Sequence, residues 1–519
     1  MKICGFTKKI LGTVWSHSSS THEYWLTRFL FLRLLGLVYF FAFLSLAIQI
    51  LPLIGEHGIF PAKNFLDAVG SQFPSRWDAF TFHPTLFWFH LSDQALVWGA
   101  WTGVTLSVVV MIWYANLPLL LVLWALYFSF VNIGQLWYGY GWEIQLLETG
   151  FLAMFLVPVV DARPFPKSPP PVPILWLLRW LAFRIYIGAG LIKVRGDQCW
   201  RDLTCLYYHY ETQPIPNPLS RWLHFFPTWF HKAGVVWNHL VELVAPWFAF
   251  GPRSARIISG VVMASFQLFL IASGNLSFLN WLTILPTIAC FDDAFLKKWL
   301  PTSLIRKAED ASQSARPNPW RTAVSLVVVV LVAYLSIVVI QNLLSPHQAM
   351  NTSFDRWNLV NTYGAFGSIG KERYELIIEG TDEPIISDST VWKAYEFVAK
   401  PGDVNRSLPI IAPYQPRIDW QIWFAAMGPP EGAPWVIHVI WKLLHNDPGA
   451  LSLLANNPFP KNPPAFIRVE YYRYHFVEPW DASSQVWRRE RVGAWLPPLA
   501  VQTPGLRDFI VKNKWEPFE

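Results

Sequence analysis

The stretch Gly188–Ala–Gly–Leu–Ile–Lys–Val–Arg–Gly–Asp–Gln–Cys–Trp–Arg–Asp–Leu–Thr–Cys205 begins as an apolar helix and ends as a charged loop with two cysteines six residues apart. A Lys and an Arg at the end of an apolar helix must pair or extend toward the membrane surface. Two close thiols outside a membrane indicate a disulfide if that side is oxidising. This junction therefore predicts a membrane protein with an ordered extracytoplasmic loop.

The composition of the whole chain also indicates a membrane protein. Of 519 residues, 53% are hydrophobic and only 15% are charged, unlike an ordinary soluble domain. Apolar runs long enough for spans of roughly 17–25 residues lie at 28–52, 94–113, 116–138, 143–160, 173–193, 235–250, 256–272, 277–291 and 321–344. We therefore predict an α-helical polytopic membrane bundle of about nine spans over residues 28–344, with the break at 273–275 deciding between eight and nine. The first span is too long for a cleavable signal peptide, so we expect it to remain as a signal anchor.

Lysine and arginine residues in the short loops predict which way the bundle faces. They gather in residues 1–27, 161–172, 251–256 and 292–320, which share one side of the membrane if the count is nine. That side is the cytoplasm. The loops 53–93 and 194–234, together with everything after about residue 345, then lie on the opposite side.

The cysteines agree with this orientation. Cys4 and Cys290 fall on or near the reducing side, whereas Cys199 and Cys205 fall on the oxidising side. The latter two have a functional interpretation, a redox-active pair, and a structural one, a disulfide that closes a short loop. A redox-active pair usually has the tighter Cys-x-x-Cys spacing and a depressed thiol pKa. We therefore favour the structural disulfide.

Residues 345–519 change character abruptly. Residues 434–444 carry a helical period, and proline-rich segments at 413–416 and 458–464 mark turns. Three segments alternate apolar with polar residues, as half-buried strands do: Arg373–Tyr–Glu–Leu–Ile–Ile–Glu379, Ala394–Tyr–Glu–Phe–Val398 and Ile467–Arg–Val–Glu–Tyr–Tyr–Arg–Tyr–His–Phe476. We therefore predict a small β-rich extracytoplasmic domain with one or two helices.

Ionisable side chains at membrane depth are functional candidates, because burying them is expensive. They are Glu143, Glu148, Arg179, Arg184, Lys193, His239 and Glu242. His239 and Glu242 are three residues apart and share a helix face, which suits a metal site or a proton relay. A buried Lys193 with a lowered pKa would suit a catalytic base. We favour the structural alternative, in which Glu143 or Glu148 pairs with Arg184 across helices, because buried charges are commonly partners of one another.

Several classes of function are not indicated by the sequence. The 41 Lys and Arg residues exceed the 35 Asp and Glu residues by only six, and the basic residues are assigned to cytoplasmic loops. No nucleic-acid partner is therefore implied. We find no Gly-rich phosphate loop, zinc-spaced cysteine set or nucleophile elbow. We accordingly expect no cofactor, no resident metal and no soluble-type active site.

Ten short segments carry a resemblance to a known family. They are Tyr24–Trp–Leu–Thr–Arg–Phe–Leu–Phe–Leu–Arg33, Leu53–Ile–Gly–Glu–His–Gly58, Gly188–Ala–Gly–Leu–Ile–Lys193, Cys199–Trp–Arg–Asp–Leu–Thr–Cys205, His209–Tyr–Glu–Thr–Gln–Pro214, Gly274–Asn–Leu–Ser–Phe–Leu–Asn–Trp281, Phe291–Asp–Asp293, Asn361–Thr–Tyr–Gly–Ala–Phe–Gly367, Arg417–Ile–Asp–Trp420 and Asn457–Pro–Phe459. Together they resemble the lipase maturation factor family, from about residue 24 to the end of the chain.

The resemblance implies a multi-pass protein of the endoplasmic reticulum membrane that helps secreted lipases fold and form active homodimers. If the chain is a bacterial relative, its membrane would be the inner membrane and the opposite side would be the periplasm. Its clients would then be secreted proteins other than lipases. The loop 194–234 and the C-terminal domain would face the client. Rigid aromatics commonly anchor protein contacts, so we expect four aromatic residues of this loop to contact the client: Trp200, Tyr207, Tyr208 and Tyr210.

The membrane region is also distantly similar to the vitamin K-dependent gamma-carboxylase. Gly190–Leu–Ile–Lys193 resembles the segment that bears the catalytic lysine of that enzyme. The preceding helix has Trp142–Glu–Ile–Gln145 where the carboxylase pattern has a histidine. The alternative hypothesis is therefore a membrane enzyme acting on a lipid, a quinone or a secreted protein, and we favour a folding factor that is not an enzyme.

Overall fold

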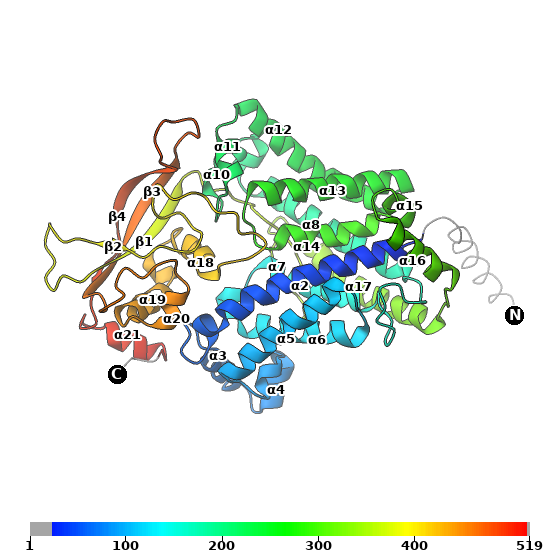
Figure 1. Cartoon of the computed structure of the whole chain (residues 1–519), viewed down its shortest axis with the longest axis horizontal. Coiled ribbons are helices and arrows are strands. Elements are labelled where there is room, and N and C mark those ends of the chain that lie inside the picture. The colour runs from blue at the N-terminus through cyan, green and yellow to red at the C-terminus, as the bar shows by residue number, and fades with distance from the viewer. Residues whose placement is uncertain (1–22, 516–519) are drawn as a thin grey trace.

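The computed structural model describes residues 23–515 of the chain. Residues 1–22 of the expected cytoplasmic segment, with Cys4, lie outside the described residues. Figure 1 shows long helices running side by side toward a β-sheet at one end, with α15 (Asp293–Leu296) and α16 (Thr302–Gln313) near the other. The molecule thus has a helical region and a sheet-containing region, in the order in which the sequence predicts them.

Five helices of the described chain are long and apolar enough to cross a membrane. They are α2 (Trp25–Ile54), α5 (Asp93–Ile112), α8 (Val172–Arg195), α13 (Arg253–Ser273) and α17 (Pro319–Leu344). The other predicted spans coincide with shorter elements: α6 (Leu117–Ile133), α7 (Gly141–Met154), α12 (Thr228–His239) with the turns that follow it, and α14 (Leu279–Thr287) with the 3-10 turn η5 (Ile288–Cys290). A span of the hydrocarbon core takes about 20 helical residues, so helix length alone supports five of the nine.

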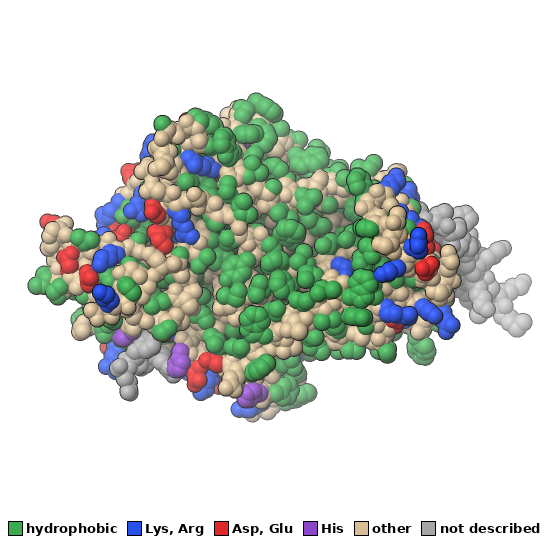
Figure 2. Space-filling view, viewed as in Figure 1, with side chains coloured by type: hydrophobic (Ala, Val, Ile, Leu, Met, Phe, Trp, Pro, Cys, Tyr) green, Lys and Arg blue, Asp and Glu red, His purple; other side chains and the backbone are tan. Residues whose placement is uncertain are grey.

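The surface of the molecule fits a membrane protein. Figure 2 shows hydrophobic side chains covering its middle and charged side chains gathered toward its two ends. The helices differ in how much of this surface they form. In the most apolar window of α8, 83% of the residues are buried inside the protein, against 28% for α17. Helix α8 is therefore central, whereas α17 presents most of its apolar surface outward.

The start of α2 is fixed by an acidic motif far along the chain. The carboxylate of Asp293 accepts hydrogen bonds from the backbone N–H groups of Trp25 and Leu26, each at 2.9 Å. Side chains that accept from the first turn of a helix satisfy donors that have no partner within the helix. The neighbouring Asp292 accepts two hydrogen bonds from Arg253, at 2.7 and 2.9 Å. The motif Phe291–Asp–Asp293 thereby joins α2 to α13.

The two long extracytoplasmic loops of the prediction contain short helices. The first holds α3 (Ala62–Gly70), α4 (Arg76–Phe82) and η1 (Leu86–Trp88). The second holds α9 (Gln198–Arg201), α10 (Leu206–Thr212), α11 (Pro218–His224) and the start of α12. Helix α12 continues into a π-helical turn, η3 (Leu240–Val244), and a 3-10 turn, η4 (Ala245–Phe250).

The C-terminal region contains a four-stranded antiparallel sheet in the order β2-β1-β3-β4. The strands are β1 (Arg373–Thr381), β2 (Lys393–Ala394), β3 (Phe466–Phe476) and β4 (Trp487–Leu499). Its helices are α18 (Arg417–Ala425), α19 (Trp435–Leu444), α20 (Pro448–Ser452) and α21 (Leu506–Lys512), with a 3-10 turn η6 (Pro430–Gly432). The region is therefore a mixture of sheet and helices rather than β-rich. Of the expected strand at 394–398, only Ala394 is in a strand, at the end of β2. The sequence did not predict β4, an edge strand, because its side chains are charged and mostly exposed and do not alternate between apolar and polar.

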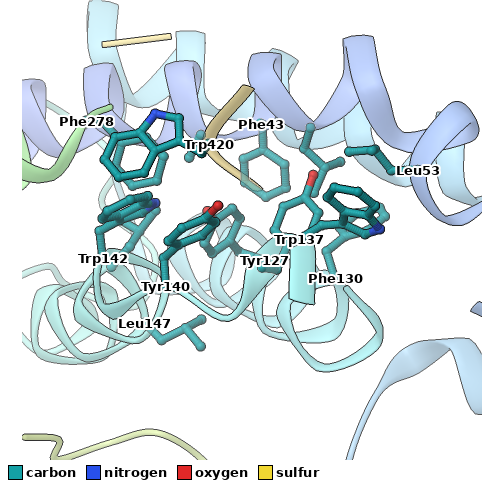
Figure 3. Close-up of a cluster of buried hydrophobic side chains, with 14 of the residues drawn as sticks. Phe43, Leu53, Tyr127, Phe130, Trp137, Tyr140, Trp142, Leu147, Phe278 and Trp420 are labelled. Carbon is teal, nitrogen blue, oxygen red and sulfur yellow. The ribbon is translucent and has the colours of Figure 1, made fainter. Parts of the chain in front are cut away.

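A buried ion pair fastens the C-terminal region to the membrane bundle. Glu143 on α7 accepts a 2.6 Å hydrogen bond from Arg417, the first residue of α18, and both side chains are fully buried. The sequence leaves open whether Glu143 or Glu148 pairs with Arg184. In the structure Glu148 pairs with Arg184, whereas Glu143 pairs with Arg417, because α18 docks against α7 from a distant part of the chain. Figure 3 shows Trp420 of α18 lying among aromatic side chains of the bundle, and its ring centroid is 5.2 Å from that of Trp142.

A second buried carboxylate on α7 also connects the bundle to the C-terminal region. Glu148 forms an ion pair with Arg184 of α8. It also accepts hydrogen bonds from the Tyr363 hydroxyl at 2.7 Å and from the Asn361 backbone N–H at 3.0 Å. Both donors belong to the motif Asn361–Thr–Tyr–Gly–Ala–Phe–Gly367. Two carboxylates of α7 thus hold separate C-terminal segments.

Replacing Arg417 with Ala should destabilise the docked arrangement strongly. Removing one partner leaves Glu143 buried without its counter-charge, which typically costs about 3–5 kcal/mol. The midpoint of thermal unfolding of the purified protein in detergent should therefore fall. Lys393→Ala is the control, because Lys393 and Asp382 form an exposed pair, and such pairs contribute about 0–1 kcal/mol. Equal midpoints for the two variants would contradict the structural role of the buried pair.

Candidate functional site

A cavity of about 400 Å³ lies between α8, the part of the loop 194–234 that holds Cys199, Cys205 and α10 (the cysteine loop), α12, α13 and α14. Its wall is mostly apolar, with aromatic side chains such as Tyr186, Trp237 and Phe266. The cavity volume is in the range of about 300–1,000 Å³ that small-molecule sites occupy. Lys193 and Glu242, two of the sequence candidates, both line it. We therefore take this cavity as the candidate functional site.

The charged side chains of the cavity form a closed cluster. Lys193 donates hydrogen bonds to Glu242 at 2.5 Å and to Asn238 at 3.1 Å. Asn238 in turn donates to the other carboxylate oxygen of Glu242 at 2.7 Å. The Lys193 ammonium also lies 5.1 Å from the centre of the Trp200 ring, a distance at which a cation and an aromatic face attract each other. The two charges therefore compensate each other at the wall of the cavity.

Two glycines of α8 allow neighbouring segments to approach this helix closely. A Cβ atom on Gly190 would lie 2.6 Å from a side-chain carbon of Leu243, and one on Gly188 would lie 2.3 Å from the carbonyl oxygen of Tyr363. Only glycine fits at either position without displacing a neighbour. Glu242 itself belongs to the π-helical turn η3, a rare element that is frequent at functional sites. The glycines of the segment Gly188–Ala–Gly–Leu–Ile–Lys193 thus allow η3 and the C-terminal region to pack closely against α8.

The predicted disulfide between Cys199 and Cys205 is present, and both residues are buried. It closes the loop that carries Trp200, whose indole N–H donates a 2.9 Å hydrogen bond to the carbonyl of Phe366. Backbone bonds reinforce this contact, since the N–H of Asp197 donates to the carbonyl of Gly367 at 2.9 Å. The loop is therefore packed against the C-terminal region and forms one wall of the cavity.

The four aromatic residues expected to contact a client lie in different surroundings. Trp200 and Tyr210 are buried and line the cavity, so a client cannot contact them in this conformation. Their rings pack inward because the cavity wall and the Phe366 carbonyl offer them apolar contacts and a hydrogen bond. Tyr207 and Tyr208 are half-buried. For all four the client contact stays a prediction.

His239 and Glu242 do not act together as their spacing suggested. A ring nitrogen of His239 lies 3.0 Å from the backbone carbonyl of Trp200, whereas Glu242 is engaged with Lys193. The π-helical turn that begins after His239 changes the helical register between the two residues. Within residues 23–515, no three His, Cys, Asp or Glu side chains gather in a way that could hold a metal ion.

The sequence reasoning missed several polar residues of the cavity. His209 lines it, and burial together with the charge of Lys193 lowers the pKa of this histidine to about 4. Asn280 donates a 2.7 Å hydrogen bond to Gln267, and both residues line the cavity. His209 and Asn280 occur in the segments His209–Tyr–Glu–Thr–Gln–Pro214 and Gly274–Asn–Leu–Ser–Phe–Leu–Asn–Trp281. The only signal in the sequence was therefore their place in family motifs.

Long apolar helices, a disulfide-closed loop and a docked C-terminal sheet define a multi-pass membrane protein with a cavity next to its C-terminal region. The chain belongs to the lipase maturation factor family. Residues 26–298 match the family described as Lipase maturation factor transmembrane domain, and residues 359–497 match the Lipase maturation factor C-terminal domain.

Relatives match along nearly the whole chain. The chain is 46% identical to Lipase maturation factor 1 of Bos taurus, over 95% of this chain and 92% of the relative. It is also 46% identical to Lipase maturation factor 1 of Homo sapiens, over 95% and 91%. Identity to Lipase maturation factor 2 of Homo sapiens is 28%, over 95% and 86%. No solved structure matches the chain.

Replacing both Cys199 and Cys205 with Ser should loosen the loop without preventing membrane insertion. Even a 15-residue loop contributes only about 3 kcal/mol in the chain-entropy account, so the thermal midpoint should change little. Hydrogen–deuterium exchange of peptides covering residues 197–212 should rise in the double variant. The free, buried Cys290 offers a control, because Cys290→Ser should leave that exchange unchanged. Detection of both loop thiols as free in protein alkylated before lysis would refute the disulfide.

Proposed function

We propose that this protein is a membrane-bound maturation factor of the endoplasmic reticulum that assists the folding and assembly of secreted lipases. The observation that carries the proposal is the 46% identity to Lipase maturation factor 1 proteins over 95% of the chain. This identity extends over both the transmembrane and the C-terminal family regions. A bacterial inner membrane is not supported, because these relatives are animal proteins.

The positions of the disulfide and the C-terminal region support a lumenal face for client contact. The loop of Cys199 and Cys205 touches the C-terminal segment through Trp200 and Phe366. Disulfides persist in oxidising compartments such as the lumen of the endoplasmic reticulum. The sheet and the cysteine loop therefore face the same lumenal side, where a secreted client folds. Of the four aromatic candidates in the loop, Tyr207 and Tyr208 are the ones that are partly exposed in this conformation.

The topology that fits this arrangement has nine crossings. Helix α2 begins beside Asp293, near α15, and its Gln49 donates a 2.8 Å hydrogen bond to the Gln415 carbonyl of the C-terminal region. Helix α2 therefore runs toward the sheet end, and α17 also leads into it, so both start on the same side and the total number of crossings from α2 through α17 is odd. Elements α6, α7, α12 with its turns, and α14 supply the four crossings besides the five long helices. Packing among longer neighbours lets such short segments cross.

The paired state of Lys193 supports a folding factor over a carboxylase-type enzyme. A catalytic lysine must have a free electron pair and reach its substrate. Here the ammonium is held by Glu242 and Asn238 at the wall of the cavity. We therefore assign Lys193 a structural role in joining α8 to η3.

Cells that lack this protein should secrete lipase of low specific activity and low dimer content. The physical reason is that an unassisted client exposes its dimer surface and misassembles. Lipase activity per unit of secreted antigen and sedimentation of the secreted lipase measure the two effects. Re-expression of the chain should restore both, and a secreted monomeric protein should be unaffected throughout. Normal lipase activity and dimer content in the deficient cells would exclude the proposed function.

The C-terminal region should be glycosylated and protected from the cytoplasm. The sequons Asn351–Thr–Ser353 and Asn405–Arg–Ser407 both begin with exposed asparagines. The double variant Asn351→Gln/Asn405→Gln should lose an endoglycosidase-sensitive shift in mobility. A tag at the C-terminus should resist protease added to cells in which only the plasma membrane is permeabilised. Digestion of the tag under those conditions would rule out an odd number of crossings.

A further inference from the structure

The cavity beside Lys193 reaches the outer surface of the protein between α12 and α13. Three of its lining residues are exposed: Ala233 and Trp237 on α12, and Phe269 on α13. Trp237 and Phe269 have 43% and 39% of their surface accessible. Figure 1 shows α12 and α13 on the same side of the helical region, both above α8 and α14 in this view. The opening between these two helices is thus reachable from the bilayer.

The interior of the cavity carries no net charge. The two charged side chains, Lys193 and Glu242, neutralise each other at 2.5 Å. The remaining wall is dominated by aliphatic and aromatic groups. Burying an uncompensated charge in such surroundings is costly, so a phosphate or carboxylate headgroup is disfavoured inside. The chemistry of the wall selects an uncharged apolar molecule.

One polar group is oriented toward this apolar space. The His209 ring lines the cavity. It makes T-shaped contacts with the rings of Phe366 and Tyr210, at centroid distances of 5.0 and 5.8 Å. With a pKa of about 4, the imidazole is neutral near pH 7 and offers one donor and one acceptor. Its ring nitrogens make no hydrogen bond to any residue between 23 and 515. A hydroxyl or carbonyl group of a bound molecule would supply that partner.

The geometry points to a binding site for an uncharged, single-chain lipid in this cavity. Its chain enters between α12 and α13, and its hydroxyl or carbonyl head lies at His209. A volume of about 400 Å³ is near the lower end of the range for ligand sites, which suits one chain better than a two-chain phospholipid. An acyl chain and an isoprenoid chain share this chemistry. The site does not depend on the proposed function, because no lipase takes part in the binding.

Photo-crosslinking to the full-length protein in nanodiscs tests the site. Three probes, each with a photoactivatable group in its chain, distinguish the ligand classes: a monoacylglycerol, an isoprenoid alcohol, and a fatty acid with the same acyl chain as the first. At least one uncharged probe should label peptides that contain Trp237 or Phe269, several-fold more than the fatty acid does. Excess unlabelled lipid of the same type should reduce this labelling at least fivefold.

Two tryptophan variants on α12 separate the cavity from the outer lipid surface. Ala233→Trp fills the opening and should reduce cavity labelling at least fivefold. Val236→Trp adds the same side chain at an exposed position that does not line the cavity, and should change labelling less than twofold. His209→Phe should weaken labelling by the uncharged probes a few-fold, because the head loses its hydrogen bond.

The outcomes are decisive in both directions. Preferential labelling by the acyl probe or by the isoprenoid probe supports the site and identifies the chain. Equal labelling of the Ala233→Trp and Val236→Trp variants would mean contact with surface lipid only and would overturn it. Stronger labelling by the fatty acid would overturn the uncharged head. Competition by unlabelled lipid on the wild-type protein decides the matter even if a variant fails to fold.

Discussion

Two buried carboxylates on one short helix hold this protein together. Glu143 and Glu148 lie on α7 and face partners from the far end of the chain, Arg417 for the first and Asn361 with Tyr363 for the second. A buried carboxylate without partners is far more costly than a missing apolar contact. The C-terminal region is therefore an integral part of the helical bundle, because undocking it would leave Glu143 without its counter-charge and Glu148, which keeps Arg184, without two hydrogen-bond donors.

This docking creates the cavity. With residues 361–367 held by Glu148, the Tyr363 carbonyl presses against Gly188, and Phe366 accepts the hydrogen bond of Trp200. The cysteine loop is thereby fixed over the end of α8. Gly190 then lets η3 approach until Glu242 reaches Lys193. Residues of the bundle, the loop and the C-terminal region thus line one cavity.

The sequence predicts local features well and distant partners poorly. The long apolar helices, the disulfide, β1, β3 and α19 each depend on patterns contained within a few residues to a few turns. The partner of Glu143 lies 274 residues away, and nothing in local composition marks Arg417 as that partner. The π-helical turn at Glu242 and the inward packing of Trp200 arise from tertiary contacts. Periodicity and residue type therefore could not reveal the cavity, although several of its residues stand in family motifs.

In the proposed topology, the cysteine loop connects the cavity with the lumenal face. The inner side of the loop, with Trp200, Leu206 and His209, lines the cavity, while Tyr207 and Tyr208 are half-buried on the same short segment. A molecule that binds the cavity only when the loop is packed as in this structure stabilises that loop conformation by mass action. Occupancy of the cavity would thus favour the loop conformation seen in this structure. By linkage, any partner that prefers this loop conformation would bind more tightly when the cavity is filled.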